Sequence, residues 1–152
     1  MSSHYYPSHP IIPLSNYHII QFKNMEMINA IGRRKTAVAR VYLMKGEGKV
    51  TVNGKDYREY FPQIHVQHNV VDPFAVVGVE NIYDLKVNVR GGGYKGQAEA
   101  VRMGLSRALV KLNEEFRSPL KAKKFLTRDS RAVERKKYGK PKARKRFQFS
   151  KR

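Results

Sequence analysis

Residues 91–96 near the middle of the chain have the spacing G-x-G-x-x-G. They follow a strand-like segment and precede a helix-like one, a setting in which a glycine-rich turn can bind a dinucleotide. Such a site also needs a second parallel strand with an acidic residue, whereas Glu114 and Glu115 fall inside the predicted helix. Three interpretations remain: a nucleotide site, a tight turn that needs positive φ, and a helix start that binds a nucleic-acid phosphate beside Arg90 and Lys95.

Three consecutive cations stand at the head of an alternating segment, in the stretch Gly-Arg-Arg-Lys-Thr at residues 32–36. A run of charge is commonly only a solvated surface. Here Arg40 and Tyr42 continue outward on the same segment, and the outward positions of residues 84–90 are Lys, Asn and Arg. A sheet face with cations beside an aromatic ring suits RNA better than solubility alone.

The sequence gives little support for a metal-binding site or a catalytic site. His65 and His68 have a helical metal-ligand spacing, but the chain has no cysteine and few carboxylates near them, so core or surface histidines are the favoured interpretation. No nucleophile elbow or paired-carboxylate arrangement occurs. The lack of cysteine excludes thiol redox chemistry, disulfides and cysteine-ligated zinc. We therefore expect a non-enzymatic protein with no cofactor and no metal site.

The last 36 residues hold sixteen Lys and Arg against two acidic residues, Asp129 and Glu134. They supply +14 of the net charge of +19, and the pI is about 10.3. So charged a segment cannot build its own core and needs a polyanion to become ordered. Nucleic acid is the first candidate partner and an anionic membrane surface the second. A solubilising run and a localisation signal are the simpler alternatives, but Tyr138, Phe147 and Phe149 are interleaved with cations, as base stacking requires.

The elements that must position these residues form an α+β domain. Period-2 alternation predicts strands at 31–43 and 84–90, with 49–52 forming a hairpin with the first of these. A stripe from Ala98 to Phe116 predicts a helix over 97–116 that packs on the sheet. Short helices are expected at 56–61 and 129–137, and Ser118-Pro119 can start another short turn of helix. The chain is expected to be extended from Pro141. Residues 64–79 stay undecided because Pro73 interrupts a long helix.

Three regions follow from these patterns. Residues 1–24 are predicted to be a disordered extension or a start-site artefact, since Met25 and Met27 precede the patterned sequence. Residues 25–116 form the globular domain, and 117–152 the extended basic tail. The apolar runs are too short for a secretory signal or for a span of about 18 residues, and we expect a cytoplasmic protein without membrane association.

Six motifs occur in order over residues 28–152: IGRRKTAVARV (31–41), GKVTVNG (48–54), VRGGGYKGQ (89–97), FLTRD (125–129), ERKKYG (134–139) and QFSKR (148–152). Each is weak alone, but the ordered set is specific. On these motifs the chain resembles the family of the ninth protein of the small ribosomal subunit, in its bacterial form. Residues 1–24 have no counterpart in that family pattern.

The resemblance implies a small mixed sheet backed by two helices, like the second domain of the fifth small-subunit protein, followed by a long extended tail. It implies a structural, cytoplasmic protein of the ribosome, bound in the subunit head to ribosomal RNA and to neighbouring head proteins. It also implies contact of Ser150, Lys151 and Arg152 with transfer RNA in the peptidyl site. The expected ribosomal RNA ligands are Arg33, Arg34, Lys35, Arg40, Arg90, Lys95, Arg107, Lys111, Arg128, Arg135, Lys136, Lys137, Lys142, Arg144, Lys145 and Arg146.

Two other classes of function compete with this one. A nucleotide-dependent enzyme would use residues 91–96, and Gly93→Val would abolish its binding of ATP or NAD. A free-standing basic chaperone or antimicrobial module would need only the charge of the tail, so a scrambled tail would serve equally well.

Overall fold

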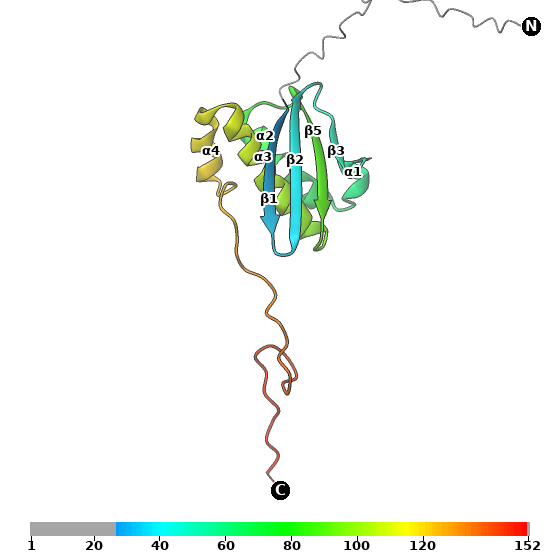
Figure 1. Ribbon diagram of the computed structural model, residues 1–152, viewed down its shortest axis with the longest axis vertical. Coiled ribbons are helices and arrows are strands. Elements are labelled where there is room, and N and C mark those ends of the chain that lie inside the picture. The colour runs from blue at the N-terminus through cyan, green and yellow to red at the C-terminus, as the bar shows by residue number, and fades with distance from the viewer. Residues whose placement is uncertain (1–26, 152) are drawn as a thin grey trace, which may run out of the picture.

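A mixed five-stranded sheet backed by helices forms the globular part of the protein, as the computed structural model shows for residues 27–151 (Figure 1). The strand order is β1-β2-β5-β3-β4. The predicted α+β class with a mixed sheet is confirmed, while residues 1–24 lie outside the described part. The strands are β1 (Ile28–Arg34), β2 (Ala37–Lys45), β3 (Val50–Val52), β4 (Lys55–Asp56) and β5 (Tyr83–Arg90). The helices are α1 (Tyr57–Tyr60), α2 (Ile64–Val77), α3 (Tyr94–Leu112), η2 (Glu114–Phe116) and α4 (Arg117–Ala122).

The first two strands form an antiparallel hairpin where the alternation predicted one strand over 31–43. The chain reverses at Lys35 and Thr36, and Lys35 takes a positive φ of 51°. The buried positions shift at this point from the even-numbered Ala30 and Gly32 to the odd-numbered Ala37 and those after it. A two-residue turn between paired strands moves the buried positions from even to odd residue numbers. The single-strand prediction was therefore wrong, although the buried face of β2 was correctly assigned.

Strand β3 does not pair with β2, so the predicted hairpin at 49–52 was also wrong. Instead β5 lies between the two strands, antiparallel to β2 and parallel to β3. The side chain of Asp84 holds the loop after β2 in this path, because its Oδ1 accepts hydrogen bonds from the backbone N–H groups of Glu47 (2.9 Å) and Lys49 (2.8 Å). Parallel strands need a long crossover, and the segment from β4 to α2 supplies it.

The crossover begins with a tight turn and two helices. Asn53 and Gly54 have φ values of 51° and 85°, which join β3 to β4 as a two-residue hairpin turn requires. The short helix predicted before Pro62 is confirmed as α1. Helix α2 continues through Pro73, which resolves the undecided segment 64–79. The hydrogen bond lost at proline costs about 3 kcal/mol, and burial of several side chains at about 1.5–3 kcal/mol each offsets that cost; they are Val66, Val70 and Phe74.

Helix α3 lies on β1 and β2 and also contacts α2. It starts three residues before the predicted Gln97 and ends at Leu112, after which a 3₁₀ turn replaces the predicted last turn. Most of the predicted apolar stripe is buried, and Ala100 and Met103 are buried besides. The wider buried surface arises because α3 lies between the sheet and α2 rather than on the sheet alone.

Two glycines let the backbone of α3 approach β1. A Cβ added to Gly32 would collide with the carbonyl oxygen of Ala100 and the backbone nitrogen of Gly104. A Cβ on Gly104 would in turn lie 3.1 Å from the backbone nitrogen of Gly32. The glycine of the first basic motif is therefore needed for helix–strand packing.

The folded part extends past Phe116, the last residue predicted for the domain. Residues 117–122 form α4, in accord with the predicted turn of helix at Ser118-Pro119, and Leu120 is fully buried. Phe125 and Leu126 then pack against the core. The chain leaves the domain at Thr127, and Figure 1 shows it running away from the domain beyond the β1–β2 turn.

The helix predicted over 129–137 does not form, because the structure has irregular backbone there. A turn at Tyr138 and Gly139, with φ of 67° at Gly139, and bends through Arg144 follow it. The chain is extended only after this point, rather than from Pro141. A helix rich in Lys and Arg with little apolar surface to bury has nothing to stabilise it.

We predict that Gly32→Ala lowers the free energy of unfolding by about 3 kcal/mol, the upper range of overpacking costs, because α3 must move away from β1. Gly93→Ala is the matched control: its added Cβ meets no atom within 4 Å, and its cost should be about 1 kcal/mol or less. Urea unfolding of both variants checks this. Equal midpoints would contradict the close contact of α3 with β1.

Candidate nucleic-acid interface

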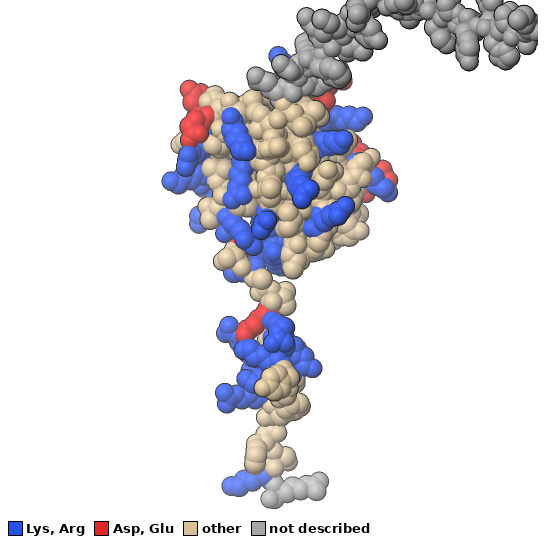
Figure 2. Space-filling view, viewed as in Figure 1, with Lys and Arg blue, Asp and Glu red and all other residues tan. Residues whose placement is uncertain are grey.

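The sheet face opposite the helices is open and basic. In register, Arg40 lies beside Asn88, and Tyr42 lies between Asn29 and Lys86. Figure 2 shows Lys and Arg side chains spread over this face and along the tail. Neighbouring strands are about 4.8 Å apart, so the cations form an array that can meet successive phosphates, with one aromatic ring among them. The exposed cations of this face are Arg33, Arg40, Lys86 and Arg90.

Arg107 and Lys111 lie at the free edge of the sheet. β1 is an edge strand, and its outward carbonyl groups would lack partners. The Arg107 guanidinium donates to the carbonyl oxygen of Ile31 and the Lys111 ammonium to that of Asn29, both at 2.8 Å. These two predicted RNA ligands thus cover the edge strand, which also protects it from pairing with other chains.

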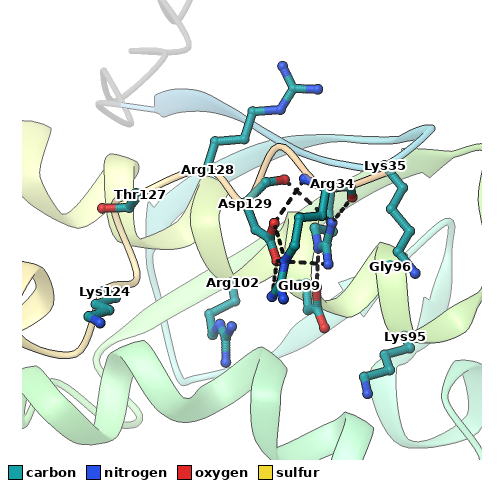
Figure 3. Close-up of a pocket in the computed structure, with 11 residues that line it drawn as sticks. Arg34, Lys35, Lys95, Gly96, Glu99, Arg102, Lys124, Thr127, Arg128 and Asp129 are labelled. Atoms are coloured by element: carbon teal, nitrogen blue, oxygen red, sulfur yellow. Dashed lines mark hydrogen bonds and ion pairs between the residues drawn. The ribbon is translucent and has the colours of Figure 1, made fainter. Parts of the chain in front are cut away.

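A basic pocket of about 550 Å³ lies where β1 ends and α3 begins. Lys35, Lys95 and Arg128 line it, and all three are exposed. They come from the β1–β2 turn, the first turn of α3 and the root of the tail. Figure 3 shows Arg128 pointing away from the centre of the pocket, while Lys35 and Lys95 lie at its side. The structure therefore brings together three predicted sites that are far apart in the sequence.

Arg34 lies at the centre of the same pocket but is not free. Its Nε donates to Glu99 Oε2 at 2.6 Å, and its Nη2 pairs with Asp129 Oδ2 at 2.9 Å. Its side chain is only 12% exposed, whereas the neighbouring Arg33 is exposed. The Arg131 side chain and backbone N–H, and then the charge of Arg34, hold the pKa of Asp129 far below its ordinary value. Asp129 therefore stays ionised at neutral pH and can pair with Arg34.

The tail presents its cations and aromatic rings to solvent. Phe149 is 94% exposed, and Tyr138 and Phe147 are also exposed. Glu134 accepts a hydrogen bond from Arg144 Nε at 2.7 Å and pairs with Lys137, which closes the bend around Gly139. The remaining predicted RNA ligands of the tail are exposed: Arg135, Lys136, Lys142, Lys145 and Arg146. Ser150 and Lys151 are exposed at its end, and Arg152 lies outside the described residues.

The expected RNA ligands left out three basic residues of this surface, although the sequence had already placed one of them, Lys86, on the outward face of its strand. Lys124 and Arg131 line the basic pocket, and Lys86 belongs to the open face. The outward position of Lys86 was visible in the alternation. Lys124 and Arg131 had no such signal, because only the path of the chain over α3 brings them to the pocket.

The glycine-rich stretch is a strand-to-helix turn. Gly91 and Gly92 have φ values of 77° and 65°, and a Cβ on Gly91 would lie 2.6 Å from the carbonyl oxygen of Thr36. The turn interpretation is therefore confirmed. After α3 the chain continues into η2 and α4, and in the described residues that follow, no second parallel strand completes a dinucleotide site.

Two features are absent from residues 27–151. No group of three or more His, Cys, Asp and Glu side chains could hold a metal ion within that stretch. No helix in it is long and apolar enough to cross a membrane.

Comparison with known proteins agrees with the motifs. The family pattern described as "Ribosomal protein S9/S16" matches residues 32–152. The small ribosomal subunit protein uS9 of Cytophaga hutchinsonii is 60% identical over 128 residues, which is 84% of this chain and 100% of that protein. The proteins of the same name from Parabacteroides distasonis and Bacteroides fragilis are 57% and 54% identical over the same shares. These matches confirm the resemblance to the bacterial form, and they show that the chain belongs to the ribosomal protein S9 family.

Proposed function

We propose that this chain binds small-subunit ribosomal RNA with its open sheet face and basic tail, and that the end of the tail contacts transfer RNA in the peptidyl site. Membership of a family of structural, non-enzymatic ribosomal proteins already assigns it a structural role in the small subunit of the cytoplasmic ribosome. The observation that carries the finer proposal is the placement of charge. The open face and the extended tail carry exposed cations with few acidic residues among them.

The physics of the tail supports an RNA partner. Ordering an extended segment costs roughly 1–2 kcal/mol per residue of backbone entropy. The tail has no core with which to offset that cost, so many phosphate contacts with release of counterions must do so. Exposed aromatic rings at Tyr138, Phe147 and Phe149 can add base stacking.

Contact with transfer RNA is proposed for Ser150, Lys151 and Arg152. A hydroxyl and two cations recognise phosphates, and phosphate contacts carry no sequence information. A site that accepts every transfer RNA needs this kind of recognition. The exposed position of Ser150 and Lys151 at the far end of the tail supports the assignment.

Neighbouring proteins of the subunit head are proposed to bind the side of the domain away from the tail. Residues 46–84 contain six acidic residues and three Lys or Arg, against a net charge of +19 for the chain. An open pocket of about 410 Å³ lies there, lined by Tyr57, Phe74 and Tyr83 together with Asp56 and Glu80. Lys49 and Arg58 also line this pocket, so its charge is mixed. A mixed surface with aromatic groups suits a protein partner better than a row of phosphates.

The whole assignment is tested by sucrose-gradient fractionation of cell extracts. We expect the chain to migrate with small subunits, because its RNA contacts hold it in the assembled head. If the chain stays at the top of the gradient at physiological salt, the proposed function is wrong.

Ala substitution of Lys86 should weaken binding to small-subunit ribosomal RNA and lower the salt slope. Losing one phosphate contact reduces the slope of log K against log salt by roughly 0.7–0.9. Lys55→Ala is the matched control, since Lys55 is exposed within the acid-rich stretch and pairs only with Glu59 among the described residues. Filter binding at several salt concentrations measures both slopes. A Lys86→Ala slope equal to the parent value would remove the open face from the interface.

Deletion of Lys151 and Arg152 should leave assembly of the subunit intact but weaken peptidyl-site transfer RNA. The expected loss is about 1–3 kcal/mol per charged contact, which equilibrium binding of transfer RNA to reconstituted subunits would detect. Unchanged affinity would refute the role of these two residues without affecting the ribosomal RNA assignment.

A further inference from the structure

Arg34 joins the globular domain to the tail. Among residues 27–151, every hydrogen bond or ion pair between the part before Thr127 and the part after it involves Arg34. Its Nη2 pairs with Asp129 Oδ2 at 2.9 Å, and its Nη1 donates to the carbonyl oxygens of Asp129 (3.4 Å) and Arg131. Figure 3 shows the guanidinium group between the tail and the start of α3.

The domain holds this guanidinium group from the other side. Glu99, in the second turn of α3, accepts a hydrogen bond from Arg34 Nε at 2.6 Å and is itself only 23% exposed. Every nitrogen of the guanidinium group thus has a partner inside the protein. The Arg34 side chain is only 12% exposed, so a phosphate has little access to it, whereas Arg33, the next residue along, is exposed.

We propose that Arg34, oriented by Glu99, is a positioning residue that fixes the direction in which the tail leaves the domain before any RNA is bound. Arg34 therefore acts through the tail rather than as a phosphate ligand, unlike its neighbours in the basic motif.

The bonds of Arg34 with Glu99, Asp129 and the Arg131 carbonyl form a latch between the domain and the tail. A second contact holds the chain just before this latch. The Arg102 guanidinium lies 4.8 Å from the centre of the Phe125 ring, and Leu120 is fully buried. Only residues 126–128 separate Phe125 from Asp129, so the chain is held at both ends of this short stretch. The Arg131 side chain and backbone N–H also donate hydrogen bonds to Asp129 and lower its pKa, but an aspartate is ionised at neutral pH without them.

Beyond Arg131 the hydrogen bonds and ion pairs of the described residues stay within the tail. The root therefore decides which way the remaining cations point. A tail whose direction is fixed before binding loses less conformational entropy on binding, which is the general basis of pre-organisation. This consequence for RNA binding rests on the proposed function; the latch itself does not.

Pulsed electron paramagnetic resonance of the free, full-length protein tests the latch without RNA. The chain has no cysteine, so Asn88→Cys on the open face and Val133→Cys in the tail give two unique spin-label sites, both exposed. We expect one narrow distance distribution in the parent protein. Arg34→Ala and Asp129→Asn should each broaden it at least about twofold, because a released chain samples many orientations.

Two control variants sharpen the test. Arg33→Ala removes the neighbouring exposed cation, and Arg131→Ala keeps the carbonyl group that Arg34 uses; both should leave the distribution narrow. Circular dichroism checks that each variant is folded. Asp129 lies outside the core, so Asp129→Asn still tests the latch if Arg34→Ala does not fold. A broad distribution in the parent, or an equally narrow one in all variants, would overturn the proposal.

Salt dependence then separates positioning from phosphate contact. In filter binding to a small-subunit ribosomal RNA transcript, Arg33→Ala should lower the slope of log K against log salt by roughly 0.7–0.9, as for one lost phosphate contact. Arg34→Ala should reduce the affinity for RNA but have the same salt slope as Glu99→Gln. The Glu99→Gln variant loosens the same latch without removing a cation. If Arg34→Ala alone lowered the slope as Arg33→Ala does, Arg34 would be an RNA ligand and the positioning role would be wrong.

Discussion

The direct contact of α3 with β1 is the constraint on which the other features of this protein depend. Because Gly32 has no side chain, the helix backbone lies against the strand. That closeness brings Arg107 and Lys111 to the free carbonyl groups of β1, so the edge of the sheet is covered by the helix that also forms its core. It also places Glu99 beside the last residue of β1. The root of the tail crosses the same region, and the basic pocket forms where these three segments meet.

The second organising principle is the separation of apolar surface from charge. The helices bury one face of the sheet, and the alternation of the strands places cations on the other. The acid-rich stretch 46–84 comprises β3, β4, α1, α2 and their loops. Its β3 and α1 lie on the side of the sheet opposite α4, from which the tail leaves (Figure 1). Like charges in the tail repel one another and provide almost no apolar surface to bury. The tail therefore has to project from the domain, and its direction is set at the few residues where it is bonded to the domain.

Where patterns were regular, the sequence predicted the structure well. Strand β5 and most of α3 followed from alternation and from a helical stripe, since their buried faces are continuous. The failures share one cause, which is a local signal overruled by distant contacts. Lys35 turns the β1–β2 hairpin without a glycine because β2 pairs on β1. Asp84 holds the loop after β2 so that β5 takes the place expected for β3. Pro73 is tolerated in α2 because the helix is buried around it.

The sequence by itself determined the amount and distribution of charge, the class of fold, the family and the identity of nearly every basic residue that could meet RNA. Local periodicity and composition carry that information, because each depends on residues close together in the chain. Only the tertiary structure decided which cations are free. Arg34 and Arg33 are indistinguishable in the motif, yet Arg34 meets Glu99 and Asp129, 65 and 95 residues away. Pairing across such distances depends on how helices and strands pack, and no local pattern records it.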